Sequence, residues 1–119
     1  MRIDRVALVL TEPLSLWGGL DPVDGRIIDA RHPQRGAVVT GRILVMPAAR
    51  GSSSSASILA EAVRAGTAPS AVVLGEQDLI LGIGSMVAAE LYGTRVPVIV
   101  WPRERVAAIV DGERLTIDG

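Results

Sequence analysis

The sequence contains no cysteine, no lysine, no phenylalanine and a single histidine, His32. Without cysteine the chain can form no disulfide and can offer no thiolate to zinc or to an iron–sulfur cluster. A single histidine also disfavours a metal site built from imidazoles of this chain alone. We therefore expect the chain to hold no metal of its own.

Aromatic side chains are also scarce, at 3% of the residues, although 49% of the residues are hydrophobic. The core must therefore be built from Val, Ile, Leu and Ala, which fits strands packed against short helices. The length of 119 residues suits one domain, residues 1–119. No internal repeat and no long linker divides the chain.

The charge balance is close to neutral, with a formal net charge of -1. It gives no reason to expect nucleic acid or an acidic membrane surface as a partner. Residues 1–5 carry charges where a signal peptide would have its apolar region, and no apolar run approaches the roughly 20 residues needed to cross a bilayer. We expect a soluble, cytoplasmic protein.

Short apolar runs rich in β-branched residues predict several strands. These runs are residues 5–10, 26–30, 37–46 (one strand or a bent pair, with a bulge at Gly41), 71–74 and 96–101. Apolar residues at helical spacing predict a helix over residues 55–65, and a second helix lies within residues 78–92. Gly66 and Gly93 stand where helices end.

Two glycine-containing segments complete this outline. Gly82-Ile83-Gly84 is interpreted as the turn that leads into the second helix. Asp111-Gly112, between strand-like residues, predicts a hairpin over residues 105–117. The order of strands, helix, strand, helix, strand and hairpin predicts a mixed α/β domain with a small central sheet.

The most unusual segment, Arg50-Gly51-Ser52-Ser53-Ser54-Ser55, lies between a predicted strand and a predicted helix. A helix N-terminus there would present unpaired N–H groups and partial positive charge, and the hydroxyls and Arg50 could bind a carboxylate or phosphate. The alternative is that one serine caps the helix and the others are solvated. The GK[ST] ending of a phosphate-binding Walker loop is missing.

Residues 15–24 form a second candidate, a long loop in which Trp17 stands beside two glycines. Such a loop is either a packed turn or a surface that meets another molecule. We predict that Trp17–Asp21 and Arg50–Ser54 lie on one face, because both interrupt an otherwise well-patterned chain. A lone histidine such as His32 is more often structural than catalytic.

Together these segments resemble one family. Trp17-Gly18-Gly19-Leu20-Asp21-Pro22, Gly25-Arg26-Ile27-Ile28-Asp29, His32-Pro33 and Gly36 are similar, in order, to the signature of the aconitase X small subunit. Arg50-Gly51-Ser52-Ser53 followed by Leu59 resembles its serine loop, and Ala68-Pro69-Ser70-Ala71 resembles a further element. The resemblance runs from about Pro13 to Val100.

The resemblance implies the swivelling β/β/α domain of the aconitase superfamily, which contributes a Gly-Ser-Ser loop to an active site. It implies Ser52 as the catalytic serine, and its neighbours as substrate-binding residues: Arg50, Gly51, Ser53 and Ser54. In ordinary aconitases the arginine follows the serines, whereas Arg50 precedes them. The iron–sulfur cluster is expected on a large partner subunit, which the glycine-rich loop would meet through Trp17, Gly18, Gly19 and Asp21.

The activity implied is the removal of water from a hydroxy acid. Residues 88–92 and 96–98 resemble the bacterial type, which acts on cis-3-hydroxy-L-proline, and archaeal members act on mevalonate 5-phosphate. Two readings outside enzymology stay open. The chain could be a stand-alone anion-binding module, or an interaction domain whose serines only cap a helix.

Overall fold

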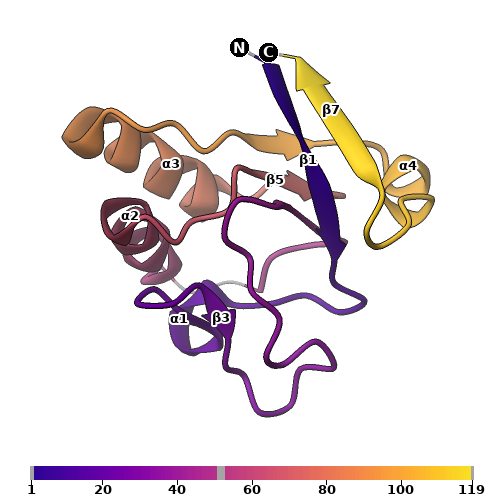
Figure 1. Ribbon diagram of the computed structural model, residues 1–119, viewed down its shortest axis with the longest axis horizontal. Helices are drawn as coiled ribbons and strands as arrows, with labels where there is room; N and C mark the ends of the chain where they lie inside the picture. The colour runs from indigo at the N-terminus through magenta and orange to yellow at the C-terminus, as the bar shows by residue number, and fades with distance from the viewer. Residues whose placement is uncertain (1, 51–52, 119) are drawn as a thin grey trace.

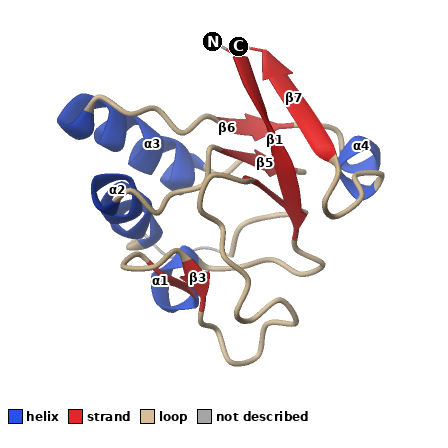
Figure 2. Ribbon diagram, viewed as in Figure 1, coloured by secondary structure: helices blue, strands red, loops and turns tan. Residues whose placement is uncertain are grey.

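A computed structural model describes residues 2–50 and 53–118 of the chain. Its centre is a five-stranded sheet with the order β6-β5-β4-β1-β7 (Figures 1 and 2). The strands are β1 (Arg2–Val9), β4 (Ile43–Met46), β5 (Ala71–Leu74), β6 (Val98–Val100) and β7 (Arg114–Asp118). The first four are parallel, and β7 runs antiparallel to β1. The mixed α/β architecture predicted from the sequence is confirmed.

The two central strands read as uninterrupted apolar runs because both faces of the sheet are covered there. Every residue of β4 and β5 is buried. On one face lie the helices α2 (Ser55–Ala65) and α3 (Leu79–Tyr92), which pack side by side. The short helix α4 (Arg103–Ala107) lies on the other face, where Val106 is buried against β4 and β5.

Both long helices agree with the predicted ones and end as predicted. Gly66 follows α2 at φ 77° and Gly93 follows α3 at φ 68°, a left-handed conformation that side chains with a Cβ rarely adopt. The start of α3 is capped by Asp78, whose Oδ1 accepts a hydrogen bond from the Leu81 N–H at 2.9 Å.

The prediction for Gly82-Ile83-Gly84 was wrong, because α3 begins at Leu79 and contains all three residues. Gly84 faces α2 so closely that a Cβ on it would lie 2.9 Å from both the Cα and the carbonyl oxygen of Ala56. Glycine at this position therefore serves the packing of two helices rather than a turn. Nothing lies within 4 Å of the corresponding position on Gly82.

The predicted hairpin over residues 105–117 was also wrong. Its first half contains α4, and its second half, β7, pairs with β1 at the other end of the sequence, with Ile117 opposite Ile3. The Asp111-Gly112 turn binds β1 instead, since Asp111 Oδ1 accepts from Val9 N and Gly112 N donates to Ala7 O, both at 2.9 Å. Pairing with β1 places the apolar Ile117 in the core cluster that also contains Val106 of α4.

Residues 10–42 contain little regular structure. They form the four-residue segment α1 (Leu16–Gly19), in which Trp17 and Gly18 depart from helical backbone angles, and the two-residue strands β2 (Leu20–Asp21) and β3 (Arg26–Ile27). The strand predicted over residues 37–46 is therefore only Ile43–Met46, and Gly41, at φ 70°, lies in a turn rather than a bulge. No helix in the part of the chain that the structure describes is long and apolar enough to cross a membrane.

Candidate functional site

The serine segment follows β4 at the carboxyl end of the parallel strands and leads into α2. Its start is held by the segment before α1: Ala49 forms a parallel bridge with Leu14, and Arg50 N donates to Leu14 O at 3.2 Å. The Arg50 and Ser53 side chains are exposed. Gly51 and Ser52, the latter predicted to be the catalytic serine, lie outside the described residues.

The N-terminus of α2 gives this segment its electrostatic character. Ser54 stands at the N-cap, and its carbonyl oxygen accepts hydrogen bonds from Ser57 N at 3.1 Å and Ile58 N at 3.3 Å. The first turn of α2 contains no acidic residue. The N–H groups of that turn and the helix dipole therefore favour an anion beside Ser53 and Ser54.

The glycine-rich loop lies directly beside the serine segment. The hydroxyl of Ser55, only 3% exposed, accepts a hydrogen bond from Trp17 N at 3.2 Å. This contact joins α1 to the first residue of α2, so the two loops share a face at Trp17, as predicted, but not at Asp21. The Trp17 side chain is 58% exposed and therefore does not fill the core of the domain.

Backbone conformation accounts for Gly18 of this loop, and close packing accounts for Gly19. Gly18 has φ 78°, which favours glycine. A Cβ on Gly19 would lie 2.8 Å from Leu14 Cδ1.

Sequence reasoning could not find the role of Ser55, because a serine at the start of a helix is normally only a cap.

Asp21 is not brought to the serine segment. Its Oδ1 accepts from Val23 N at 2.9 Å and shapes the turn before β3. The carbonyl of Pro22, in that turn, accepts a hydrogen bond from Thr67 Oγ1 at 2.6 Å, just beyond the C-terminus of α2. An 11-residue helix is about 16 Å long, so this turn lies near the opposite end of α2 from Ser54.

His32 is a structural residue. It is 6% exposed, its Nδ1 accepts from Gln34 N at 3.0 Å, and its Nε2 lies 3.0 Å from Glu12 O. Because Nδ1 is the acceptor, the ring proton is on Nε2 and is donated to Glu12 O. Both ring nitrogens are committed to holding two loops together.

Asp78 is a site neighbour that sequence reasoning missed. Besides capping α3, it lines a small hollow together with Arg50 and Ser55. An aspartate directly before an apolar run is the usual signal of a helix N-cap, and that signal could have placed it at this edge of the sheet. Among residues 2–50 and 53–118, no three His, Asp or Glu side chains are grouped to hold a metal ion.

Two other features of the surface are a cavity, whose lining includes Pro47 and Ala48 just before Arg50, and an ion pair on α2. A cavity of about 520 Å³ lies at the carboxyl ends of β1, β4 and β5 on the α4 side, with the Arg103–Glu76 ion pair (2.9 Å) on its lining. On the outer side of α2, hydrogen bonding from Arg64 lowers the pKa of Glu61, and the same bonds raise the pKa of Arg64. This pair is nearer to the C-terminus of α2 than to the serines.

Fold and site together define the class of small α/β domains that carry a serine-bearing loop at the carboxyl edge of a mainly parallel sheet. The chain belongs to the aconitase X swivel domain family, whose model matches residues 3–119. The family resemblance and the swivelling-domain fold inferred from the sequence are thereby confirmed.

Three similar proteins illustrate the family. Cis-3-hydroxy-L-proline dehydratase of Pseudomonas aeruginosa is 45% identical over 71% of this chain, which spans only 15% of that enzyme. The phosphomevalonate dehydratase small subunit of Methanothermobacter thermautotrophicus is 32% identical over 87% of this chain and 75% of its own length. The crystal structure of Thermococcus kodakaraensis aconitase X (holo-form) superposes with a TM-score of 0.88 at 26% identity, covering 99% of this chain and 84% of that chain.

Proposed function

We propose that this chain is the small subunit of an aconitase X-type hydro-lyase that removes water from cis-3-hydroxy-L-proline. The observation that favours this substrate is the 45% identity to the P. aeruginosa dehydratase, against 28–39% to phosphomevalonate dehydratase small subunits. The coarser assignment, a part of a dehydratase, rests on the names of both groups of relatives.

The proposed chemistry uses the serine segment in two ways. Dehydration of a hydroxy acid needs a base for the proton, assistance for the departing hydroxide, and groups that hold the carboxylate. We assign the base to Ser52, because a serine can act as a base only where its pKa is lowered, and a helix N-terminus favours the alkoxide. Arg50, Gly51, Ser53 and Ser54 would hold the carboxylate through hydrogen bonds and charge.

The iron–sulfur cluster that the family implies does not fit the donors of this chain. The sequence has no cysteine, and both nitrogens of His32, its one histidine, are engaged in hydrogen bonds. We therefore place the cluster on a large partner subunit and expect this chain alone to be inactive. Assistance to the departing hydroxide would come from that partner.

The surface that meets the partner would include the glycine-rich loop: Trp17, Gly18, Gly19 and Asp21. Trp17 is the anchor we favour, because it is 58% exposed beside the serine segment and tryptophan is enriched among residues that dominate binding energy. We propose a cytoplasmic complex with the large subunit and a small hydroxy acid, without nucleic acid or membrane.

A second candidate is the small subunit of mevalonate 5-phosphate dehydratase. The observation in its favour is that the M. thermautotrophicus relative, 75% of which this chain covers, is itself named a small subunit. A stand-alone anion-binding or interaction module is the remaining alternative, and stable association with a large aconitase X subunit would argue against it.

The test is to co-express the chain with the large aconitase X subunit of the same organism and to assay the complex on both substrates. Turnover of cis-3-hydroxy-L-proline is expected, and turnover of mevalonate 5-phosphate alone would select the second candidate. Ser52→Ala should remove most activity and leave the fold and partner binding intact, whereas Ser57→Ala, an exposed serine of α2, should change nothing. Near-normal turnover by Ser52→Ala would refute its role as base.

A further inference from the structure

The outward face of α3 is largely apolar, with Glu90 as its one exposed charged residue. We define the α3 stripe as five side chains at helical spacing, with their exposed fractions: Leu79 (67%), Ile83 (55%), Met86 (72%), Val87 (40%) and Leu91 (65%). We propose that the α3 stripe docks against an apolar surface of the large aconitase X subunit. This inference rests on the proposed function and extends its interface from the loops to a helix.

The stripe is not needed by the core of this domain. The opposite side of α3, formed by Leu81, Gly84, Ser85 and Ala88, is the side buried against the sheet and α2. A helix that is apolar all round is normally buried all round. The neighbouring helix α2 behaves differently, since the side chains it exposes include Ser57 and Arg64. The exposed apolar face is therefore particular to α3.

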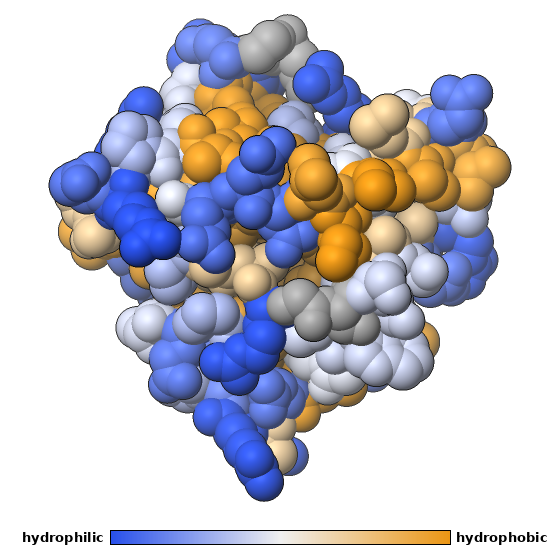
Figure 3. Space-filling view, turned by 180° about the vertical axis from the view of Figure 1, so that it is seen from behind, coloured by the Kyte–Doolittle hydropathy of each residue, from blue (hydrophilic) through white to orange (hydrophobic). Residues whose placement is uncertain are grey.

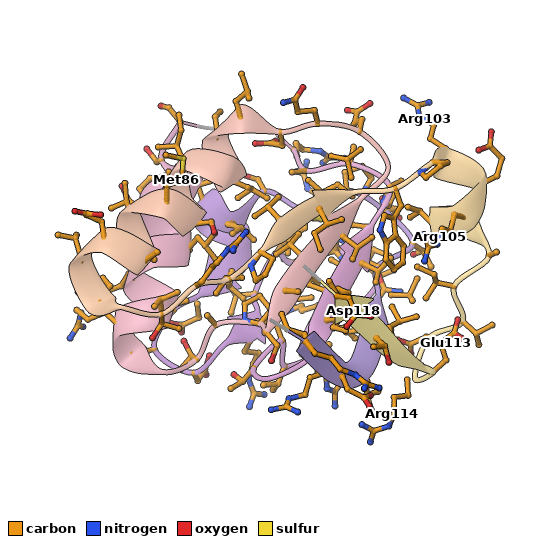
Figure 4. All side chains as sticks on the ribbon, turned by 90° about the horizontal axis from the view of Figure 1, so that it is seen from above. Met86, Arg103, Arg105, Glu113, Arg114 and Asp118 are labelled. Carbon is orange, nitrogen blue, oxygen red and sulfur yellow. The ribbon has the colours of Figure 1, made fainter. Side chains whose placement is uncertain are left out.

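The stripe forms a continuous band on the surface. In the view from behind, apolar side chains form a band over the position of α3 (Figure 3). Met86, near its middle, points away from the body of the domain (Figure 4). Between Leu79 and Leu91 only Glu90 carries a charge. Glu90 is exposed on the same face, and the rest of the stripe is apolar. Apolar surface of this extent marks an interaction site and calls for a largely apolar partner surface.

The position of the stripe identifies its occupant. It begins at Leu79, directly after Asp78, which lines the same hollow as Arg50 and Ser55. The stripe is thus continuous with the face that carries the serine segment and Trp17. A partner that completes the site at those loops lies against the first turn of α3 as well. A second copy of this chain on the same face would instead cover the serine segment that substrate must reach.

The length of a relative supports a large protein as the partner that covers the α3 stripe. This chain spans 15% of the P. aeruginosa dehydratase, so 85% of that protein lies outside the matched domain. Burial of even a few of the stripe's side chains would contribute strongly to association, because each is large, apolar and more than one-third exposed in this chain.

The experiment measures the affinity of the full chain for the large subunit by isothermal titration calorimetry. Met86→Glu and Ile83→Glu should each weaken binding about thirtyfold or more, as expected of residues that dominate an interface. Val110→Glu is the matched control. Val110 is 66% exposed in the segment that joins α4 to β7, outside the α3 stripe, and its variant should bind within about twofold of the unmodified chain.

Three outcomes separate this inference from the proposed function. Unchanged affinity of both α3 variants, with the helix intact by circular dichroism, would overturn the docking surface even if the complex is an active dehydratase. Weakened binding in a complex that dehydrates neither substrate would support the docking surface and refute the function. A dimer of the isolated chain that Met86→Glu dissociates in sedimentation would overturn the choice of occupant.

In an active complex, the turnover of Met86→Glu should recover at saturating small subunit, because a docking residue affects assembly and not chemistry. Turnover that stays low at saturation would contradict a docking role. The milder double variant Met86→Ala/Leu91→Ala keeps good helix formers on α3 and should follow the same trend if a glutamate variant does not fold.

Discussion

Gly84→Ala tests whether the position of α2, and with it the serine segment, depends on its close contact with α3. The new Cβ would lie 2.9 Å from two backbone atoms of Ala56, 0.5 Å inside the 3.4 Å at which ordinary contacts begin. Backbone cannot rotate away as a side chain can, so α2 and α3 must separate. Forcing extra volume into a packed contact typically costs about 1–3 kcal/mol.

The same substitution also has a favourable effect, because alanine is a better helix former than glycine by about 1 kcal/mol. The net expectation is a loss of roughly 1 kcal/mol in the free energy of unfolding, or about 3–5 °C in Tm. Gly82→Ala is the matched control, since it lies in the same helix with nothing within 4 Å of the new Cβ. It should raise the stability by about 0.5–1 kcal/mol.

Urea denaturation of both variants gives the measurement. Their difference, about 1–3 kcal/mol, reports the contact with Ala56 because the helix-propensity effect is common to both. We also expect faster amide hydrogen exchange in the first turn of α2 for Gly84→Ala. Equal stabilisation by the two substitutions would refute the reasoning, because it would mean that the helices adjust at no cost.

Three further predictions concern the loops and the missing metal. Ser55→Ala should lower the stability by about 1 kcal/mol and speed hydrogen exchange at Trp17, whereas Ser57→Ala, an exposed serine, should do neither; equal exchange in both would contradict the contact between the loops. Trp17→Ala should weaken binding to the large subunit with the fold intact, and unchanged affinity would remove it as an anchor. The purified chain should contain no stoichiometric iron by metal analysis, and iron with cluster absorbance would disprove the placement of the cluster.

The elements that the sequence predicted well are those whose stability is decided locally. β5, and the Ile43–Met46 part of the strand predicted over residues 37–46, are short apolar runs because both of their faces are covered, and that composition is visible without a structure. The helix α2 has an apolar face at helical spacing and ends at Gly66, so its bounds could be read from periodicity and one residue. The family motifs were equally local, each a few consecutive residues in a fixed order.

The candidate site was predictable in part. The position of the serine segment between a strand and a helix follows from its neighbours, and the structure bears out that junction for Arg50 and Ser53–Ser54. Its contact with the glycine-rich loop was predicted only as a shared face. The hydrogen bond that connects the two loops runs from Trp17 to Ser55. These residues are 38 positions apart in the sequence, so no local pattern specifies the contact.

Other features were decided only by the tertiary structure. Asp111-Gly112 is a strong local hairpin signal. However, β7 pairs with β1, and this pairing buries the Ile117 side chain in the core. In the sequence Gly84 is typical of a turn, and only the packing of α2 against α3 shows that it allows a close helix contact. The apolar composition of α3 is the clearest case. The sequence shows that a helix of this composition is expected to be buried. Only the packed domain shows which of its faces stays exposed, because burial depends on the elements that surround a residue.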